Sequence, residues 1–246
     1  MPHADQKTVR NRLLAALPAA EFASLALGLT RVTLEFGQSL HRAGDVIDYV
    51  FFPESGFISV MVVLADGHAI EIGLIGLEGA AGISVALGAT TSHSETTCQT
   101  GGSAWRISAG DLTSAFARSP HVRDLILRYV EAFSIQVAQT AACNGHHELG
   151  QRLARWLLGA HDRSDREELS LTQDLIAVML GVRRSTVSVA AGQLQKAGLI
   201  RYQHGRITIV DRVGLENAAC ECYEAVRGEY RRLFGEEDEE QVPLTV

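Results

Sequence analysis

The stretch from Thr172 to Ile200 constrains the fold more than any other part of the chain. Its sequence, TQDLIAVMLGVRRSTVSVAAGQLQKAGLI, favours helix almost throughout, but Gly181 interrupts it. Thr172 can cap a first helix, and Asp174 lies in the first turn, where a negative charge favours the helix dipole. Gly181 stands where a tight turn needs a positive φ, which glycine adopts at little cost. A short helix, a glycine-containing turn and a second helix form the helix-turn-helix plan.

The second helix carries basic and hydroxyl residues on its outer face. Its inward face is predicted to hold Val187, Ala190, Ala191, Leu194 and Ala197. In a helix-turn-helix the N-terminal residues of the second helix enter the major groove, where an arginine can donate two hydrogen bonds to guanine. The following segment, LIRYQHGRITIVD, predicts two short strands around the turn Gln203-His204-Gly205, a wing that would lie against the DNA backbone. The residues predicted to contact DNA are Thr172, Arg183, Arg184, Ser185, Thr186, Ser188, Arg201, His204 and Arg206.

The charge distribution supports a polyanionic partner, although the net charge of −7 does not. Residues 118–234 carry 16 Lys and Arg against 13 Asp and Glu, whereas residues 1–117 carry 6 against 11. Within 183–206 there are five basic residues and no acidic one. A local basic face matters more than the net charge when the partner is nucleic acid. A plain helical hairpin with solvated charges is the alternative, and the combination of capped helix, turn, basic helix and basic hairpin disfavours it.

The first half of the chain has a different pattern. From about Arg31 it consists of short β-rich runs separated by turn residues: RVTLEF, DVIDYVFF, GFISVMVVL, HAIEIGLI and GSAWRI. Many short strands at regular spacing predict an antiparallel sandwich or barrel, such as a jelly roll. Asp66-Gly67 is a hairpin signal between two of these runs. Helical spacing is found before this region, at 8–29, and again at 148–161 and 212–234.

A long helix is predicted at about 121–143, ended by Gly145. Apolar residues fall three and four apart along it, so one face must be buried. Packing within the chain and a seam between two parallel helices of a dimer both explain this stripe. The residues predicted for a dimer interface are Val122, Leu125, Ile126, Tyr129, Phe133 and Val137.

The segment LTQDLIAVMLGVRRSTVSVAAGQLQKAGLIRYQHGRITIVD resembles the winged helix-turn-helix of the Crp/Fnr superfamily of bacterial regulators. The order of the upstream regions is similar too, so the resemblance spans roughly residues 25–234. It implies an α+β protein whose β jelly roll is like a cyclic-nucleotide-binding domain. The implied boundaries are 1–117 for the sensory β-roll domain with N-terminal helices, 118–145 for the dimerisation helix, 146–234 for the winged helix-turn-helix domain and 235–246 for an acidic flexible tail.

The resemblance also implies a function. The protein would be a cytoplasmic homodimer that regulates transcription at two-fold-related sites in double-stranded DNA, with RNA polymerase as a further partner. Arg184, Ser185 and Ser188 fall on the positions that usually contact bases. Val189 stands where several members have a second arginine, so the usual half-site sequence is in doubt. A signalling module that acts through protein partners without DNA is the alternative.

Ligands of the β domain are harder to assign. The family's cyclic-nucleotide binders use a Gly-Glu pair and a later arginine for the phosphate, but here Ile83 follows Gly82 and Ser94-Glu95 stands where the arginine is expected. A carboxylate there would repel a phosphate, so the effector is unknown and is not expected to be a cyclic nucleotide.

Metal, cofactor and catalytic sites are not predicted. The family's iron–sulfur sensors have an N-terminal cysteine cluster, but no cysteine here precedes Cys98. Cys220 and Cys222 fall on a predicted helix, where positions two apart point away from each other. The segment CNGHHELG, with Cys143, His146, His147 and Glu148, is the most metal-like cluster, and a polar helix end explains it better. No nucleophile motif or phosphate loop is present, so an enzyme is not expected. No apolar run approaches the roughly 20 residues that a membrane span needs.

Overall fold

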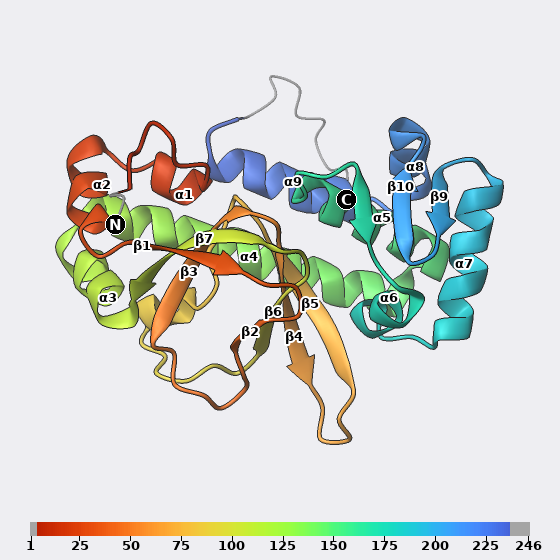
Figure 1. Ribbon diagram of the computed structural model, residues 1–246, viewed down its shortest axis with the longest axis horizontal. Coiled ribbons are helices and arrows are strands. Elements are labelled where there is room, and N and C mark those ends of the chain that lie inside the picture. Colours follow the sequence, from red (N-terminus) through yellow and green to blue (C-terminus); the bar gives the residue numbers. More distant parts are fainter. Residues whose placement is uncertain (1–3, 237–246) are drawn as a thin grey trace, which may run out of the picture.

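The computed structural model describes residues 4–236. Figure 1 shows a β domain packed beside the long helix α4 (Pro120–His146), with a smaller domain of helices and strands at one end. The fold is therefore α+β, as the sequence predicted. The acidic tail predicted at 235–246 lies outside the described residues from position 237 onward.

The β domain contains two antiparallel sheets, with strand orders β1-β7-β3 and β2-β6-β4-β5. Its strands are β1 (Thr30–Leu34), β2 (Ser39–His41), β3 (Tyr49–Ser55), β4 (Ile58–Val63), β5 (Ala69–Ile75), β6 (Glu95–Cys98) and β7 (Gly102–Ser108). β4 and β5 form the hairpin predicted at Asp66-Gly67, where Gly67 has a φ of +85° and the Asp66 carboxylate accepts the N–H of His68 at 3.0 Å. The 3₁₀ turn η1 (Ile83–Leu87) lies between β5 and β6.

Helices cover one end of this domain. They are α1 (Arg12–Ala15), α2 (Ala19–Ala26) and α3 (Ala109–Arg118), followed directly by α4. Ser119 caps α4 by accepting the N–H of Val122 at 3.2 Å, and Pro120 occupies the first helical position, where its missing N–H costs nothing. Gly145 lies inside α4 instead of ending it, since the helix continues to His146.

The apolar stripe of α4 is buried within the single chain. Val122, Leu125, Ile126 and Tyr129 belong to one core with the N-terminal helices and β7, and the Tyr129 hydroxyl donates to the carbonyl of Ala80 at 3.2 Å. These four residues were predicted for a dimer seam, and that assignment is corrected: packing against the chain's own β domain already covers them. Phe133 and Val137 are half-buried.

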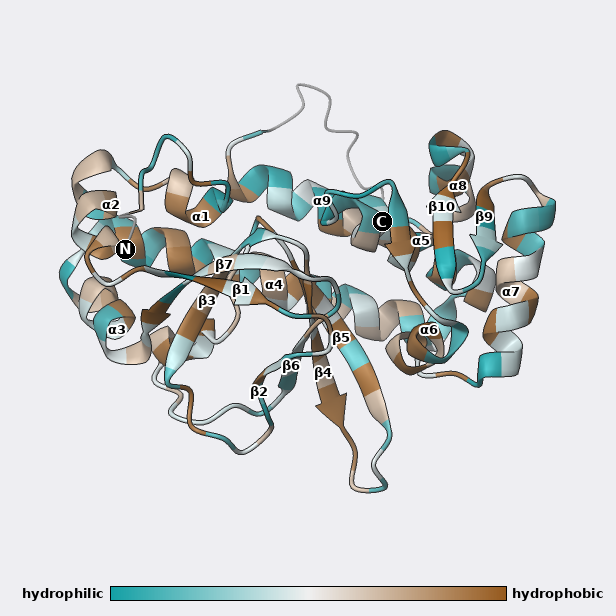
Figure 2. Ribbon diagram, in the orientation of Figure 1, coloured by the Kyte–Doolittle hydropathy of each residue, from teal (hydrophilic) through white to brown (hydrophobic). Residues whose placement is uncertain are grey.

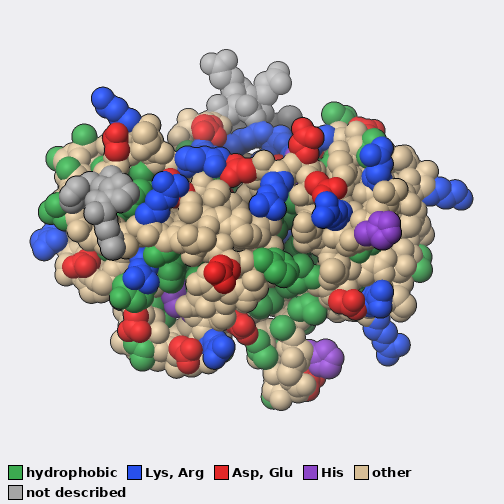
Figure 3. Space-filling model, viewed as in Figure 1, with side chains coloured by type: hydrophobic (Ala, Val, Ile, Leu, Met, Phe, Trp, Pro, Cys, Tyr) green, Lys and Arg blue, Asp and Glu red, His purple; other side chains and the backbone are tan. Residues whose placement is uncertain are grey.

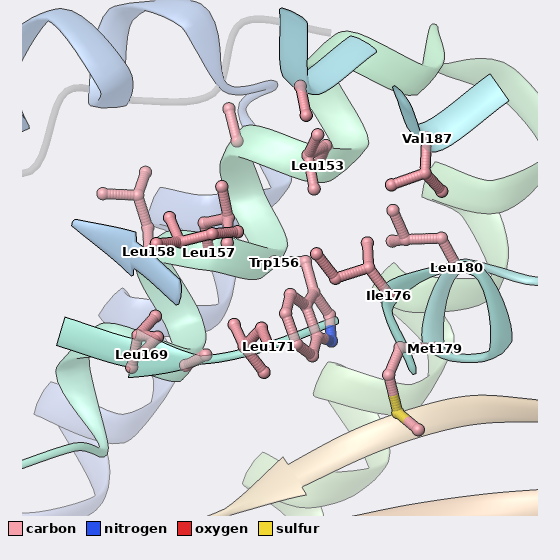
Figure 4. Packing of buried hydrophobic residues seen from close by; sticks show 14 of the residues in the cluster. Leu153, Trp156, Leu157, Leu158, Leu169, Leu171, Ile176, Met179, Leu180 and Val187 are labelled. Carbon is pink, nitrogen blue, oxygen red and sulfur yellow. The ribbon is translucent and has the colours of Figure 1, made fainter. Parts of the chain in front are cut away.

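The C-terminal part forms the winged domain. Its elements are α5 (Leu149–Asp162), β8 (Glu168–Ser170), α6 (Gln173–Leu180), α7 (Arg184–Lys196), β9 (Ile200–Gln203), β10 (Arg206–Ile209) and α8 (Arg212–Ala218). Trp156 of α5 stands at the centre of its core, surrounded by leucines of α5 and by apolar side chains of α6 and α7 (Figure 4). Leu171 and Ile176 are fully buried beside it, and α6 is among the most hydrophobic segments in Figure 2.

The core of the winged domain continues into the β domain. Phe57, Met61 and Leu74 of the β domain belong to the same cluster as Trp156. α6 packs on β5, where Ile70 approaches Gly181. Apolar burial therefore holds the two domains together, in addition to the covalent connection through α4 and α5.

The helix predicted at 212–234 is two helices. α8 ends at Ala218, and α9 (Cys222–Leu233) begins after a short link in which the backbone of Ala219 is extended. α9 runs back alongside α4 (Figure 1), and its Tyr230 and Leu233 belong to the core of the N-terminal part. The start of this C-terminal helix still packs on the winged domain through Tyr223, and its end packs on the N-terminal part. Among residues 4–236 no single helix is long and apolar enough to cross a membrane, although α6 and α7, bent by 104°, pass that test as a pair by length and composition.

Candidate nucleic-acid interface

The geometry of α6 and α7 is that of a helix-turn-helix. The two helices meet at 104°, within the range of the motif. The Thr172 hydroxyl caps α6 by accepting the N–H of Leu175 at 3.2 Å. Gly181 ends α6 with a φ of +63°, and its N–H bonds back to the carbonyls of Ala177 and Val178. The glycine is needed because a side chain at this φ is strained.

One face of α7 anchors the helix and the opposite face is open to solvent. Val187 and Ala190 are buried in the winged domain's core. All the DNA-contact residues predicted on or beside α7 are exposed: Arg183, Arg184, Ser185, Thr186 and Ser188. Val189, at 62% exposure, lies on the same outward side, so a large apolar side chain interrupts the polar face.

The N-terminus of α7 is suited to a phosphate. Arg183 occupies the N-cap position, and its side chain makes no capping hydrogen bond. Amide groups in the first turn of a helix carry partial positive charge and bind anions when no side chain caps them. The Arg184 guanidinium lies 3.5 Å from the Asp174 carboxylate, with both side chains about two-thirds exposed. An ion pair so exposed is weak, so it leaves Arg184 available to another partner.

The wing is a tight hairpin. β9 and β10 pair with Gln203 opposite Arg206, leaving His204 and Gly205 as a two-residue turn. Both turn residues have positive φ, +49° and +77°, as a type I′ turn requires. The Gly205 carbonyl accepts the N–H of Leu171 at 2.7 Å, which places the tip of the wing beside the start of α6.

The predicted wing residues share one surface hollow. Arg201, His204 and Arg206 line it together with Glu168 of β8. Arg206 and Glu168 form an exposed ion pair at 3.1 Å. Thr172 is also exposed, but its hydroxyl already serves as the α6 cap.

Acidic residues adjoin this surface, which the sequence did not indicate. The run without acids, 183–206, suggested an uninterrupted basic face, but folding places Asp174 and Glu168 beside it. Figure 3 shows Lys, Arg and His side chains at the end of the molecule formed by the winged domain, with acidic side chains among them. A basic surface interleaved with carboxylates disfavours a polyanion placed in the wrong register.

A buried polar connection links α5 of the winged domain to the β domain. The Trp156 indole N–H donates to Oε1 of Glu71 at 2.7 Å, and the Ser59 hydroxyl donates to Oε2. Glu71 is fully buried, and burial raises the pKa of its carboxyl to about 7, although both hydrogen bonds oppose this shift. Arg163 at the end of α5 makes a buried ion pair with Glu78 at 2.7 Å. Sequence patterns gave no signal for these residues, since their partners are far apart in the chain.

Two further places hold polar groups that could receive a ligand. A cavity of about 250 Å³ lies where β5, α4, α5 and α9 meet, with Glu71, Gln136, Arg155 and Tyr230 in its lining. Three cysteines and a histidine meet nearby: Cys143, His147, Cys220 and Cys222. The sequence prediction that Cys220 and Cys222 point apart is wrong, because the link between α8 and α9 replaces the expected helix at this position.

Comparison with known proteins identifies the C-terminal domain. The family model described as a Crp-like helix-turn-helix domain matches residues 151–218. A search of curated proteins finds no match.

Solved structures resemble roughly three quarters of the chain. FixK2 from Bradyrhizobium japonicum superposes with a TM-score of 0.68 at 17% identity, covering 78% of this chain and 98% of its own. A transcriptional regulator of the Crp family from Thermus thermophilus gives 0.65 at 21% identity, covering 76% and 96%. The c-di-GMP-responsive global regulator CLP from Xanthomonas campestris gives 0.63 at 17% identity, covering 78% and 99%. Residues 151–218 therefore form a Crp-like helix-turn-helix domain, and the chain as a whole has the fold of these regulators.

Proposed function

We propose that this protein regulates transcription as a homodimer that binds a specific, two-fold-related DNA sequence through the N-terminal end of α7. One observation carries the proposal: α7 is anchored by Val187 and Ala190, while its opposite face exposes Arg184, Ser185 and Ser188. A guanidinium held on a rigid helix can donate two hydrogen bonds to guanine in the major groove. The wing residues Arg201, His204 and Arg206, together with Thr172, Arg183 and Thr186, then contact the DNA backbone.

The dimer interface is proposed for the open face of α4. Leu127 on this face is 45% exposed. Further along α4, at alternating steps of three and four residues from Leu127, lie Val130, Ser134, Val137 and Ala141. These residues are exposed or half-buried in the single chain. Steps of three and four residues give the 3.5-residue repeat of a two-helix seam, and small residues let the helices approach closely. Val137 is the member of this seam that the sequence had already indicated.

Selection from a random duplex library, followed by mobility-shift assays, tests the DNA proposal. An enriched two-fold-related sequence is expected. Arg184→Ala should then weaken binding to that sequence by about 1–3 kcal/mol, a loss of roughly 5- to 150-fold in affinity. Arg123→Ala, an exposed arginine on α4, is the control and should leave affinity unchanged. If the intact protein enriches no sequence from the library, the result favours the alternative, a module that acts through protein partners.

Sedimentation analysis tests the dimer independently. Ala141→Glu places two carboxylates across the proposed seam and should shift the protein toward monomer, because like charges repel at close range. Ala142→Glu is the matched control, since Ala142 is also exposed but lies outside the three- and four-residue steps. Equal behaviour of the two variants would contradict this placement of the seam.

A further inference from the structure

Four potential metal ligands meet where three helices join. Cys143 is near the C-terminal end of α4, and His147 is the residue that caps that end. Cys220 lies in the link between α8 and α9, and Cys222 is the first residue of α9. The three cysteines form a buried cluster of their own, separate from the hydrophobic cores.

The distances fit a single tetrahedral ion. The three sulfur atoms and one imidazole nitrogen all lie within 4.8 Å of one another. The Sγ atoms of Cys143 and Cys220 are 3.5 Å apart, and Sγ of Cys222 is 3.5 Å from Nδ1 of His147. Zinc bonds of about 2.3 Å to sulfur and 2.0–2.1 Å to nitrogen place tetrahedral ligands about 3.5–3.8 Å apart. The space between the ligands suits one ion and is too small for a cluster of several metal atoms.

The surrounding groups orient the ligands. Nε2 of His147 lies 3.1 Å from the Glu221 carboxylate, which holds the ring so that Nδ1 faces the sulfurs. A carboxylate behind a histidine is the usual outer partner of a metal-binding imidazole. The Gln139 side-chain amide donates to Sγ of Cys222 at 3.1 Å, as it would to a thiolate.

Positive charge is available to balance a thiolate-rich site. Arg155 interacts electrostatically with Cys143, and Arg152 does so with both Cys143 and Cys220. The Nε atoms of both arginines are buried without a hydrogen-bond partner. A buried, unpaired N–H is costly unless a negative group lies nearby. Three thiolates and one Zn²⁺ carry a net charge of −1, which these guanidinium groups offset.

We propose that Cys143, His147, Cys220 and Cys222 bind one Zn²⁺ in a closed tetrahedral site. Binding replaces the three thiol protons, which pass to solvent, and forms three Zn–S bonds and one Zn–N bond. A site with four protein ligands and no open position is structural.

The ion would join segments that are far apart in sequence. It would fix the end of α4 to the start of α9, at the point in the chain directly before α5, the first helix of the winged domain. The site therefore stabilises the position of α9 along α4. This inference does not depend on DNA binding, and its test uses metal content and spectra alone.

The experiment uses the full chain, expressed without a histidine tag and purified under reducing, oxygen-free conditions. We expect about one zinc per chain by elemental mass spectrometry, retained through dialysis. After chelation, titrated Co²⁺ should give the strong visible bands of a tetrahedral site and the near-ultraviolet thiolate charge-transfer band.

Matched variants test the ligand set. Cys143→Ser and Cys220→Ser should retain less than about 0.1 equivalent of zinc and lose the thiolate band of Co²⁺. Cys98→Ser is the control, because Cys98 is equally buried but lies in the β domain. Glu221→Gln leaves every ligand in place and should weaken zinc affinity about 10- to 100-fold. If ligand variants fail to fold, circular dichroism shows it, and the Co²⁺ spectrum of the wild-type chain still decides the question.

Three results would overturn the proposal. The first is a folded wild-type chain that neither retains zinc nor gives the tetrahedral Co²⁺ spectrum. The second is an equal loss of metal in the Cys98→Ser and Cys220→Ser variants. The third is a metal-free native protein in which peptide mapping finds Cys143 and Cys220 joined as a disulfide, since the cluster would then be a redox pair.

Discussion

Replacing Glu71 with glutamine should change how the stability of this protein depends on pH. Glu71 lies on β5, fully buried between the two domains, and its carboxylate accepts hydrogen bonds from Trp156 and Ser59. Burial raises its pKa from 4.5 to about 7. Glutamine has the shape of the protonated carboxyl group and can keep both hydrogen bonds, with its carbonyl facing Trp156 and its amide facing Ser59.

The size of the effect follows from the pKa shift. A rise from 4.5 to about 7 corresponds to roughly 3 kcal/mol at 1.36 kcal/mol per pKa unit. Because the folded state binds this proton more tightly than the unfolded state, the contribution to stability is fully present below pH 4.5. It is lost as the pH rises through 7. The glutamine variant does not titrate, so it should match the wild type at pH 4.5 and exceed its stability by up to roughly 3 kcal/mol above pH 7.

Thermal unfolding between pH 4.5 and 8.5 measures this difference. For a chain of this size 1 kcal/mol shifts Tm by about 2–4 °C, so the gap between variant and wild type should reach roughly 6–12 °C at high pH. Glu131→Gln, at an exposed position on α4, is the control and should show no such trend. A gap that stays constant across the pH range would refute the conclusion that Glu71 holds a proton in the folded state.

Two other changes test the winged domain. Gly181→Ala forces a side chain into a φ of +63° with Ile70 3.3 Å away and should destabilise the protein by about 1–3 kcal/mol. Gly192→Ala lies inside α7 with open space around it and should stabilise the protein by about 0.5–1 kcal/mol. Thermal unfolding of the two variants measures both effects. The double variant with Arg201→Ala and Arg206→Ala should weaken binding to all DNA sequences alike. Titration at several salt concentrations should show the slope of log K against log salt concentration reduced in magnitude by about 2. A loss of affinity confined to one sequence would mean that the wing contacts bases.

Local signals explain why the helix-turn-helix could be predicted from sequence. The Thr172 cap, the positive φ of Gly181 and the two-residue turn at His204 and Gly205 depend on backbone geometry within a few residues. The strands of the β domain were predicted for the same reason, since alternation and turn residues such as Asp66-Gly67 are also local.

The parts that were mispredicted depend on contacts between distant segments. The stripe on α4 indicated burial correctly, but periodicity does not identify the covering partner, which is the chain's own β domain around Tyr129. The break between α8 and α9 has no proline or glycine to mark it, since the sequence there is NAACEC. α9 turns away because Tyr230 and Leu233 pack against the N-terminal core. The meeting of Cys220 with Cys143 follows from that packing.

The buried contacts of α5 determine how freely the winged domain can move. Arg163 at the end of α5 donates to Glu78 at 2.7 Å and to Gln136 of α4 at 3.2 Å. Removing one partner of a buried ion pair costs about 3–5 kcal/mol, whereas an exposed pair contributes about 0–1 kcal/mol. Glu78→Gln should therefore destabilise the protein by about 3 kcal/mol or more.

The exposed pair between Arg10 and Asp165 joins the same two regions and provides the control. Asp165→Asn should cost less than about 1 kcal/mol in denaturant unfolding, and hydrogen exchange should show α5 opening more often in the Glu78 variant alone. Equal effects would mean that the buried pair does not hold the domain. A ligand shifts an equilibrium between two states only by its difference in affinity for them. If the expected difference is found, any effector that rotates the winged domain must break these buried contacts. It must then bind the rotated state more tightly by at least the free energy of those contacts.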